Sequence, residues 1–378
     1  DMGVDELASY LTEEIKTKDL FHNNMSAHKN AWAAIMVDLL RVDGSYDSEG
    51  LGLYYFDLDI YKILNELTDE EVEETFAQYN CKMNKDELNI LMQVVLGVFK
   101  IASAINYAKA TLTPDEKKDI LEYRRFDIYV MFNCSKTTKN IRSFLPVKGD
   151  ENMVVRYVKK VFGCGSEDAK NALEIIFSLL VQASEVAGSE KILFKHEKKD
   201  AYQIEASRYV LKNYKTSKFY QCSKCGKLTP YNLRGKCTQD RCIGILSEVD
   251  PDEVLAMNFY RNQYKKKKIE SIVIQEHTAQ LERKQAKEYQ IDFKNKKINI
   301  LSCSTTFEMG IDIGGLETVF MRNVPPTPAN YVQRAGRAGR RKDSAAYILT
   351  YCGIGSHDYT YFMEPEKMIS GVINPPCF

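Results

Sequence analysis

Arginines crowd one short stretch near the end of the chain, "NYVQRAGRAGRRKD" at residues 330–343. Arg334, Arg337 and Arg340 recur at intervals of three with only glycine and alanine between them, so on a helix they fall on one face. Small spacers let such a helix approach a partner surface closely, where guanidinium groups can stabilise charge on a phosphoryl group. The alternative is a basic, solvated helix, although each glycine costs about 1 kcal/mol in a helix interior.

A second group with chemical potential is a cysteine cluster, in which Cys222 and Cys225 are followed by Cys237 and Cys242. Two tight turns that each present two thiolates are typical of a tetrahedral zinc site, and a full thiolate shell is closed to water. We therefore predict a structural zinc ion, with a disulfide or free thiols as alternatives, and not a small enzyme centred on the cysteines. Whether the neighbouring basic side chains contact nucleic acid stays open; they are Lys224, Lys227, Arg234 and Lys236.

The composition excludes some classes of protein. The 378 residues are 44% hydrophobic and 28% charged, which suits two or three folded domains. The 52 basic and 52 acidic side chains cancel, so any nucleic-acid-binding surface must come from local clustering. We find no apolar run long enough to cross a bilayer and no signal peptide, which predicts a cytoplasmic protein with no membrane partner. The start at Asp1 and the end at Phe378 suggest a piece of a longer polypeptide.

The first part of the chain is expected to be mainly helical. Over residues 1–190, stretches such as "VDELASYLTEEIKTKDLF" and "KDELNILMQVVLGVFK" repeat apolar residues at helical spacing, which predicts a helical accessory region. Residues 191–218 hold two β-prone runs around a charged turn, which predicts a β-hairpin. One interpretation is that this hairpin ends a winged-helix unit. Residues 219–247 contain the four cysteines and form the predicted zinc ribbon.

Residues 248–378 alternate between short apolar strands and helical stretches. The predicted strands are "SIVIQE", "INILSCS", "TVFMRN" and "AAYILTY", and the predicted helices include "AQLERKQAKEYQIDFKN" and "PANYVQRAGRAG". This order indicates an α/β domain, a parallel sheet with helices on both faces. Such sheets bind ligands at the carboxyl ends of their strands, where the loops "CSTTFEMGID" and "NVPPTPANYVQRAG" begin.

Two of these stretches together resemble a known family. "STTFEMGIDIGGL" at 304–316 and "QRAGRAGR" at 333–340 resemble motifs V and VI of superfamily two helicases, which mark the second RecA-like lobe. The amino-acid sequence from "EHTAQL" onward is most similar to those of large DNA helicases of the Lhr and MrfA kind, including bacterial defence-associated relatives. The resemblance covers residues 270–378 clearly, and the cysteine cluster and "RSFLPVKG" at 142–149 more weakly. It implies a RecA-like lobe after a mainly helical region and a zinc ribbon.

The resemblance implies a role for residues around the nucleotide. Gln333, Arg337 and Arg340 would face the γ-phosphate of ATP, with the two arginines as arginine fingers. Gly310 and Asp312 would approach the ribose. Without the resemblance, Asp312 would be an ordinary loop acid.

The resemblance also implies contacts to a nucleic-acid backbone. Thr305 and Thr306 would bind phosphates, with His277 and Thr278 near another phosphate and Arg334 nearby. Hydroxyls and loop amides suit phosphate contacts that do not depend on the base sequence. Taken alone, His277 favours a structural histidine over a phosphate contact.

Part of an ATPase site is missing from the sequence. ATP hydrolysis needs a glycine-rich loop ending in Gly-Lys-Ser/Thr and acids for Mg²⁺, and the sequence has no such loop. "DEEV" at 69–72, "PDEK" at 114–117 and "DEVL" at 252–255 resemble parts of a magnesium motif, but each starts a predicted helix, where acids are favoured. We predict helix N-termini there, and no ATP hydrolysis by this chain alone.

The expected function is therefore that of half a motor. We expect the C-terminal part of an ATP-dependent nucleic-acid helicase or translocase, with DNA favoured over RNA. ATP and Mg²⁺ would bind between this lobe and an N-terminal lobe outside the present sequence. The alternative is a non-catalytic nucleic-acid-binding or scaffold module that keeps the RecA-like shape.

Overall fold

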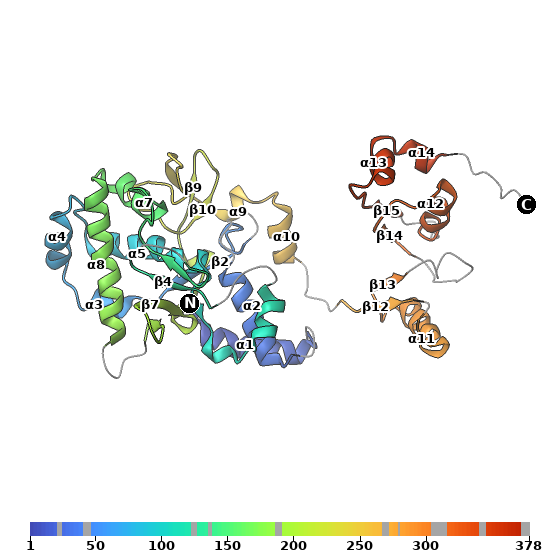
Figure 1. The fold of residues 1–378 in the computed structure, drawn as a ribbon, viewed down its shortest axis with the longest axis horizontal. Helices are drawn as coiled ribbons and strands as arrows, with labels where there is room; N and C mark the ends of the chain where they lie inside the picture. The colour runs from blue at the N-terminus through green and yellow to red at the C-terminus, as the bar shows by residue number, and fades with distance from the viewer. Residues whose placement is uncertain are drawn as a thin grey trace, which may run out of the picture. The chain divides into compact units, whose positions relative to one another are not determined.

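The chain forms two compact units, Asp1–Ile269 and Glu270–Phe378 (Figure 1). The structure is a computed structural model and describes residues 1–20, 25–40, 47–121, 127–134, 138–185, 191–266, 272–278, 280–303, 316–339 and 345–371. The first unit contains the predicted helical region, the hairpin and the cysteine segment. It also contains residues 248–266, which the sequence analysis had grouped with the following lobe.

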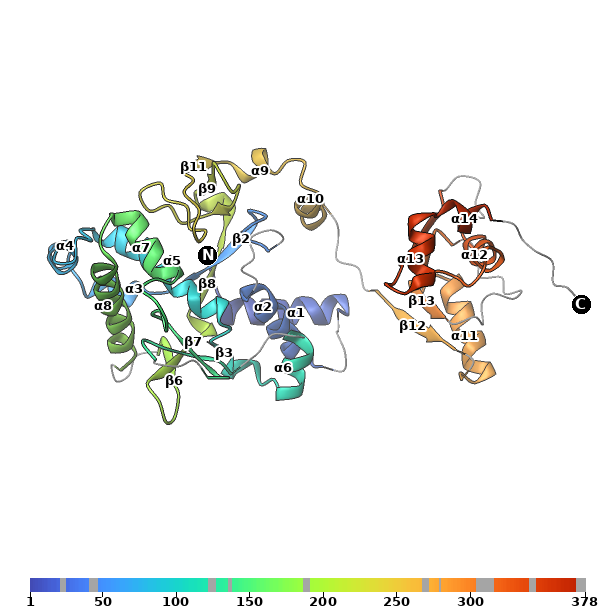
Figure 2. The same cartoon turned by 45° about the horizontal axis from the view of Figure 1, so that its top comes forward.

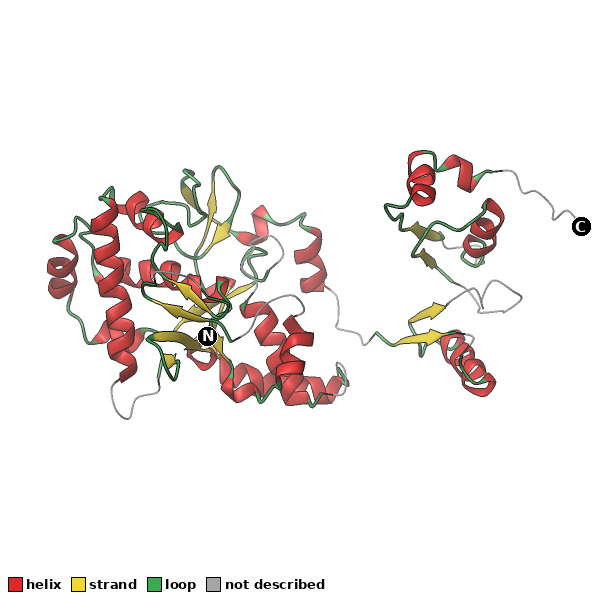
Figure 3. Ribbon diagram, in the orientation of Figure 1, coloured by secondary structure: helices red, strands yellow, loops and turns green. Residues whose placement is uncertain are grey.

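Helices make up much of the first unit, and several lie around its strands (Figure 3). They are α1 (Val4–Lys18), α2 (Ala27–Leu39), α3 (Tyr61–Asn65), α4 (Asp69–Ala77), α5 (Lys85–Ile101), α6 (Pro114–Leu121), α7 (Met153–Phe162), α8 (Ser166–Glu185), α9 (Pro251–Val254) and α10 (Phe259–Lys266). α5 buries a stripe at helical spacing that includes Leu88, Leu91, Met92, Val95 and Phe99. Its buried face is part of one large apolar cluster that unites most of the first unit.

The acidic strings at 69–72, 114–117 and 252–255 all start helices, as predicted. At α4, the Thr68 hydroxyl accepts a hydrogen bond from the Glu71 N–H, and the Glu71 carboxylate accepts one from the Thr68 N–H. Thr113 and Glu116 make the same reciprocal pair at α6. These carboxylates therefore serve helix caps, because the first amides of a helix have no partner within it.

The described strands of the first unit form three sheets. β1 (Met2–Gly3), β8 (Tyr209–Asn213) and β2 (Tyr54–Leu58) form one, and β10 (Leu228–Thr229), β9 (Phe219–Cys222) and β11 (Leu246–Val249) another. The third has the order β3 (Ile105–Asn106), β7 (Ala201–Glu205), β4 (Tyr129–Met131) and β5 (Ile141–Ser143), with β6 (Leu193–Lys195) also on β7.

The predicted hairpin after residue 191 is confirmed by the antiparallel pairing of β6 with β7. Strands within residues 1–190, in contrast, were not predicted. β2 pairs along its whole length with β8, from Tyr54 opposite Asn213 to Leu58 opposite Tyr209. The helical region therefore depends on strands contributed from much later in the sequence.

Arg261 fixes α10 to the body of the first unit. Its side chain is 2% exposed, and it donates to the backbone carbonyls of Leu51 and Gly52 and to the Asp252 carboxylate at 2.7 Å. Gly52 has a positive φ of 57°, and a Cβ there would lie 2.6 Å from the Pro251 side chain. A glycine is needed at this position for both conformation and space. α9 and α10 therefore belong to the first unit (Figure 2).

The second unit alternates strands with helices. Its elements are β12 (Ile274–His277), α11 (Arg283–Lys294), β13 (Ile300–Cys303), β14 (Thr318–Met321), α12 (Pro328–Ala335), β15 (Tyr347–Thr350), α13 (Ser356–Met363) and α14 (Glu366–Ile369). β12 pairs with β13 and β14 pairs with β15, both in parallel. The alternating α/β order and parallel pairing are as predicted, with two strand pairs among the described residues.

Among the described helices, we find no segment that combines the length and apolar character needed to cross a bilayer.

Candidate functional site

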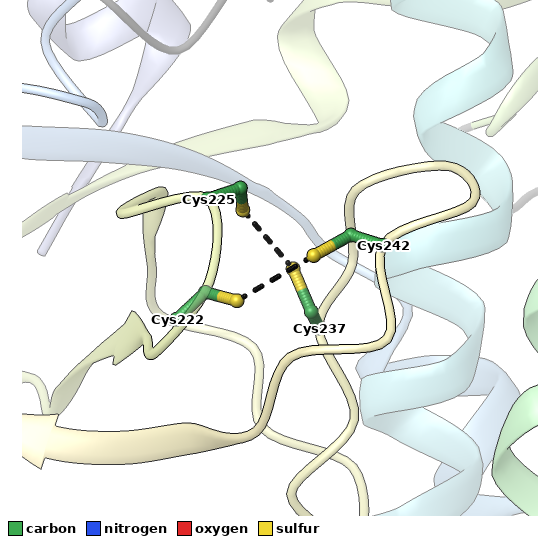
Figure 4. A group of neighbouring side chains, drawn as sticks. All are labelled: Cys222, Cys225, Cys237 and Cys242. Carbon is green, nitrogen blue, oxygen red and sulfur yellow. Dashed lines mark hydrogen bonds between the residues drawn. The ribbon is translucent and has the colours of Figure 1, made fainter.

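The four predicted metal ligands converge in the first unit (Figure 4). β9 ends at Cys222, and the turn that follows returns at Gly226, whose N–H bonds the Cys222 carbonyl at 3.0 Å. Gly226 has a positive φ of 71°, so this turn favours glycine. The chain then passes through β10 to the second turn, which carries Cys237 and Cys242.

The sulfur positions fit a tetrahedral metal site. All four Sγ atoms lie within 4.8 Å of one another, with Cys222 and Cys242 3.7 Å apart and Cys225 and Cys237 3.6 Å apart. Four sulfurs at a Zn–S distance of about 2.3 Å would be roughly 3.8 Å apart. The cluster therefore has the donor set and spacing for one thiophilic ion.

Backbone amides point at three of the sulfurs. The Lys224 N–H donates to Cys222 Sγ at 3.5 Å, and the Gln239 and Gly244 N–H groups donate to Cys237 and Cys242 at 3.4 Å. Burial raises the pKa of the Cys222 thiol, but amide hydrogen bonds act against it, and the pKa falls to about 6. The backbone is thus arranged to stabilise a thiolate at this position.

Gly244 leaves no space for a larger residue beside the cluster. A Cβ at this position would lie 2.3 Å from Cys222 Sγ and 3.0 Å from the Lys224 Cβ. The two turns therefore approach each other here as closely as the backbone allows, and only glycine permits that approach.

Two ion pairs attach the cysteine segment to the helices. Arg156 on α7 binds both carboxylate oxygens of Asp240, at 2.9 and 2.7 Å. Arg234 binds both oxygens of Glu87, at 2.8 and 2.9 Å, and lies over the Phe162 ring. Of the basic side chains left open by the sequence, Arg234 is thus engaged within the protein. Sequence reasoning missed Arg156 and Glu87, because their partners lie 84 and 147 residues away.

In the second unit, His277 lies at the carboxyl end of β12 and is buried. Its Nε2 is 3.2 Å from the Gln290 amide nitrogen on α11. Thr278 follows immediately and is half-buried, and its carbonyl accepts from the Leu281 N–H at 3.2 Å. The structure thus supports a packed histidine at a strand end, the position where a ligand-binding loop starts.

Gln333 and Arg334 lie on the last turn of α12, which starts with a Thr327 cap on the Asn330 N–H. Gln333 is exposed and Arg334 is half-buried. Desolvation raises the pKa of the Cys303 thiol at the end of β13, and the Arg334 guanidinium acts to lower it. Cys303 ends β13 directly before the predicted loop at 304–316.

The expectation of a helix through residue 339 is wrong. α12 ends at Ala335, and Arg337 lies in the following turn, where its N–H bonds the Arg334 carbonyl at 3.2 Å. Gly336 caps the helix, and Ala338 forms a parallel bridge with Leu316. The helix stops because glycine lowers helix stability, and the chain gains a pairing partner instead. Arg337 is therefore presented by a turn and not by a helix face.

Gly339 makes a second close approach, since a Cβ there would lie 2.9 Å from the Ala346 Cβ. Its φ of 75° is also in the left-handed region. The glycines of this motif thus end the helix and bring the turn against Ala346, the residue directly before β15, which is a more local role than the approach to a partner that we expected.

Asp358 on α13 is a structural residue that the sequence did not single out. Its carboxylate accepts from the Gly353 N–H at 2.9 Å and the Val324 N–H at 3.4 Å, so it joins the loops that follow β15 and β14. His357 Nε2 lies 3.1 Å from the Pro325 carbonyl. These contacts fix the loop that leads into α12. No sequence motif near Asp358 predicted these contacts.

The other predicted residues lie outside the described part of the chain. They are Thr305, Thr306, Gly310, Asp312 and Arg340.

Comparison with known proteins agrees with the motifs. Residues 237–342 match the family of the helicase conserved C-terminal domain. The predicted resemblance to the C-terminal part of a superfamily two helicase is confirmed for this segment.

Individual relatives match over part of the chain. The Druantia protein DruE of Escherichia coli (strain UMEA 4076-1) is 35% identical over 179 residues, 41% of this chain and 10% of DruE. The ATP-dependent DNA helicase MPH1 of Saccharomyces cerevisiae (strain ATCC 204508 / S288c) is 28% identical over 97 residues, 26% of this chain and 10% of MPH1. Among solved structures, the DUF1998 helicase MrfA bound to DNA and AMPPNP matches 29% of this chain and 16% of MrfA. The sequence identity is 24% and the TM-score is 0.26. The chain spans about a tenth of the length of these curated relatives.

Proposed function

We propose that this chain supplies the second motor lobe of an ATP-dependent DNA helicase or translocase. The observation that carries the proposal is the place of the two motifs in the α/β order of the second unit. β13 ends at Cys303, directly before the loop at 304–316, and α12 ends at Ala335, inside the arginine motif. The family match to residues 237–342 and the name of MPH1 support a helicase that acts on DNA.

The proposed nucleotide site uses arginines to stabilise charge on the transferred phosphoryl group. Gln333, Arg337 and Arg340 would face the γ-phosphate, and Gly310 and Asp312 the ribose. The phosphate-binding loop and the magnesium acids would come from an N-terminal lobe outside this sequence, since no Gly-Lys-Ser/Thr loop occurs within it.

The proposed nucleic-acid contacts go to the backbone and not to base edges. They would involve His277, Thr278, Thr305, Thr306 and Arg334. Affinity should then fall as salt rises and change little with base sequence.

For the cysteine cluster we propose a structural zinc ion. Four thiolates leave no open coordination position, so the ion would hold the two turns together and would take no part in hydrolysis. The predicted zinc ribbon is β9, β10 and β11 with these turns.

The decisive experiment uses a longer polypeptide that restores an N-terminal lobe. We expect DNA-stimulated ATP hydrolysis, and we expect Arg337→Ala to lower kcat by roughly 1000-fold or more. Arg322→Ala is the matched control, because Arg322 is exposed after β14 in the same unit, and its activity should be unchanged. Full activity of Arg337→Ala would contradict the arginine-finger assignment.

The same experiment separates the second candidate, a non-catalytic nucleic-acid-binding or scaffold module. That module would bind DNA with the same salt dependence but hydrolyse no ATP in the longer polypeptide. Residues 1–378 alone should bind without hydrolysis under either proposal, so only the longer polypeptide distinguishes them.

A further inference from the structure

Lys160, on the last turn of α7, reaches into the second cysteine turn. Its Nζ donates to the backbone carbonyls of Cys237 at 2.5 Å, Cys242 at 3.1 Å and Gln239 at 3.2 Å. All three N–H donors of the Lys160 ammonium thus have an acceptor on one short loop. Two of the three carbonyls belong to the proposed metal ligands themselves.

α7 provides a rigid base for this contact. One face of the helix is buried through Val154, Val155, Tyr157, Val158 and Val161. The helix begins with an Asn152 cap on the Val155 N–H and ends at Gly163 in the left-handed conformation. Because both ends and one face are fixed, the helix sets the position of the Lys160 backbone from which the ammonium reaches the loop.

The loop held by Lys160 is the unusual part of the cluster. Cys237 and Cys242 are separated by four residues, whereas Cys222 and Cys225 are separated by two. The longer turn has more backbone freedom, and fixing it costs more conformational entropy. Three carbonyls directed at one cation reduce that freedom before a metal ion binds.

The charge of Lys160 also has the right sign. A zinc ion with four thiolates carries a net charge of about −2. A nearby ammonium lowers the energy of such a centre, in addition to the amide groups that point at the sulfurs. Arg156, one turn earlier on α7, binds Asp240 in the same loop, so α7 supplies two cations to this turn.

We propose that Lys160 is a positioning residue for the metal site: it holds the turn from Cys237 to Cys242 in its ligating shape and offsets the charge of the tetrathiolate centre. This inference rests on the proposed zinc site. The affinity for the metal then depends on α7. Loss of the ammonium weakens metal binding although Lys160 is not itself a ligand. Residues that orient the ligands of a metal typically contribute about 10- to 100-fold in affinity.

The test compares two adjacent lysines. Lys160→Met removes the ammonium and keeps an unbranched apolar stem, and Lys159→Met is the matched control on the same helix turn. The hydrogen bonds of the Lys159 ammonium go to Glu151 and Ser166, whereas those of Lys160 go to the cysteine turn. Zinc content would be measured by atomic emission, and zinc affinity and release rate by competition with a chromogenic chelator. Circular dichroism would check that both variants are folded.

We expect about 10- to 100-fold weaker zinc binding for Lys160→Met, and affinity within twofold of the native protein for Lys159→Met. Equal zinc affinity in the native protein and Lys160→Met would overturn the positioning role, as would equal losses in the two variants. If Lys160→Met does not fold, Lys160→Gln is measured with the same expected direction. A native protein that binds no zinc would refute the proposed metal site itself, which is a different outcome from failure of the Lys160 role.

Discussion

The two units of this chain bury their apolar side chains to very different extents. In the first unit, residues from α2, α4, α5, α7 and α8 share one cluster, and Phe99 at its centre is completely buried. Among the described residues of the second unit, strand residues remain open: Phe320 is 61% exposed and Tyr347 is 72% exposed. The first unit therefore has its own apolar core. The second unit instead has exposed apolar residues on its described strands, as interaction surfaces often do.

Substitution of one phenylalanine in each unit tests this difference in burial most directly. We expect Phe99→Ala to lower the free energy of unfolding of the first unit by about 3–5 kcal/mol, because it leaves a cavity in a closed core. Phe320→Ala should change the stability of the second unit by less than about 0.5 kcal/mol. Chemical denaturation, followed with a probe in each unit, would measure both. A larger loss for Phe320→Ala would mean that the second unit depends on its strand face for its own stability.

Arg261→Met would sharpen the assignment of α10 to the first unit. It leaves the carbonyls of Leu51 and Gly52 without their donor, and we expect a loss of about 2–3 kcal/mol in the first unit only. Arg241→Met is the control, because the Arg241 side chain is 79% exposed and should contribute little. A loss in the second unit, or none in the first, would contradict the boundary after α10.

Gly244→Ala tests whether the cysteine cluster stabilises the first unit. The added methyl overlaps Cys222 Sγ, so we expect weakened zinc binding and a loss of about 1–3 kcal/mol. Gly226→Ala is the control for glycine chemistry in the same cluster: nothing lies within 4 Å of its Cβ, and only its positive φ is strained. Zinc retention and thermal unfolding would be compared. Equal zinc retention in both variants would show that the close approach at Gly244 is not needed for the metal.

The smallest expected effect is a pH dependence near α10. Hydrogen bonds from Lys265 and Arg261 hold the pKa of the Asp252 carboxyl well below its usual range. A depressed pKa stabilises the fold above the pKa of the unfolded chain, about 3.9, and the contribution is lost as pH falls further. Because Asp252 is partly exposed, the effect should stay below about 1 kcal/mol. Asp252→Asn should reduce the acid sensitivity of the first unit; an unchanged acid transition would refute this.

Local signals in the sequence predicted local structure well. Thr68 and Glu71 indicated the start of α4, and the alternation after residue 270 indicated the parallel strands. The spacing of the four cysteines predicted their convergence, because two turns are enough to bring them together. The RAGRAGR stretch predicted a helix that carries the arginines, which is wrong beyond Ala335 because Gly336 ends the helix before Arg337.

Non-local pairing could not be predicted in the same way. β2 is rich in aromatic residues, but its partner β8 lies more than 150 residues later, and only that pairing makes it a strand. α7 lies within the predicted helical region, and Val154, Val158 and Val161 recur at helical spacing, although valines suit strands as well as helices. The contacts of α7 with the cysteine turns follow from the fold, and no motif near Lys160 or Arg156 announces them.

The anchoring of Arg261 has a mechanical consequence. Arg261 lies nine residues before Glu270, where the second unit begins. A pull on the chain after α10 would therefore load the bonds from its guanidinium to Leu51, Gly52 and Asp252 before it could stretch the core. Lys265, one turn later on α10, bonds Asp252 and Tyr214 and would share this load, part of which Arg261 passes to the backbone just before β2.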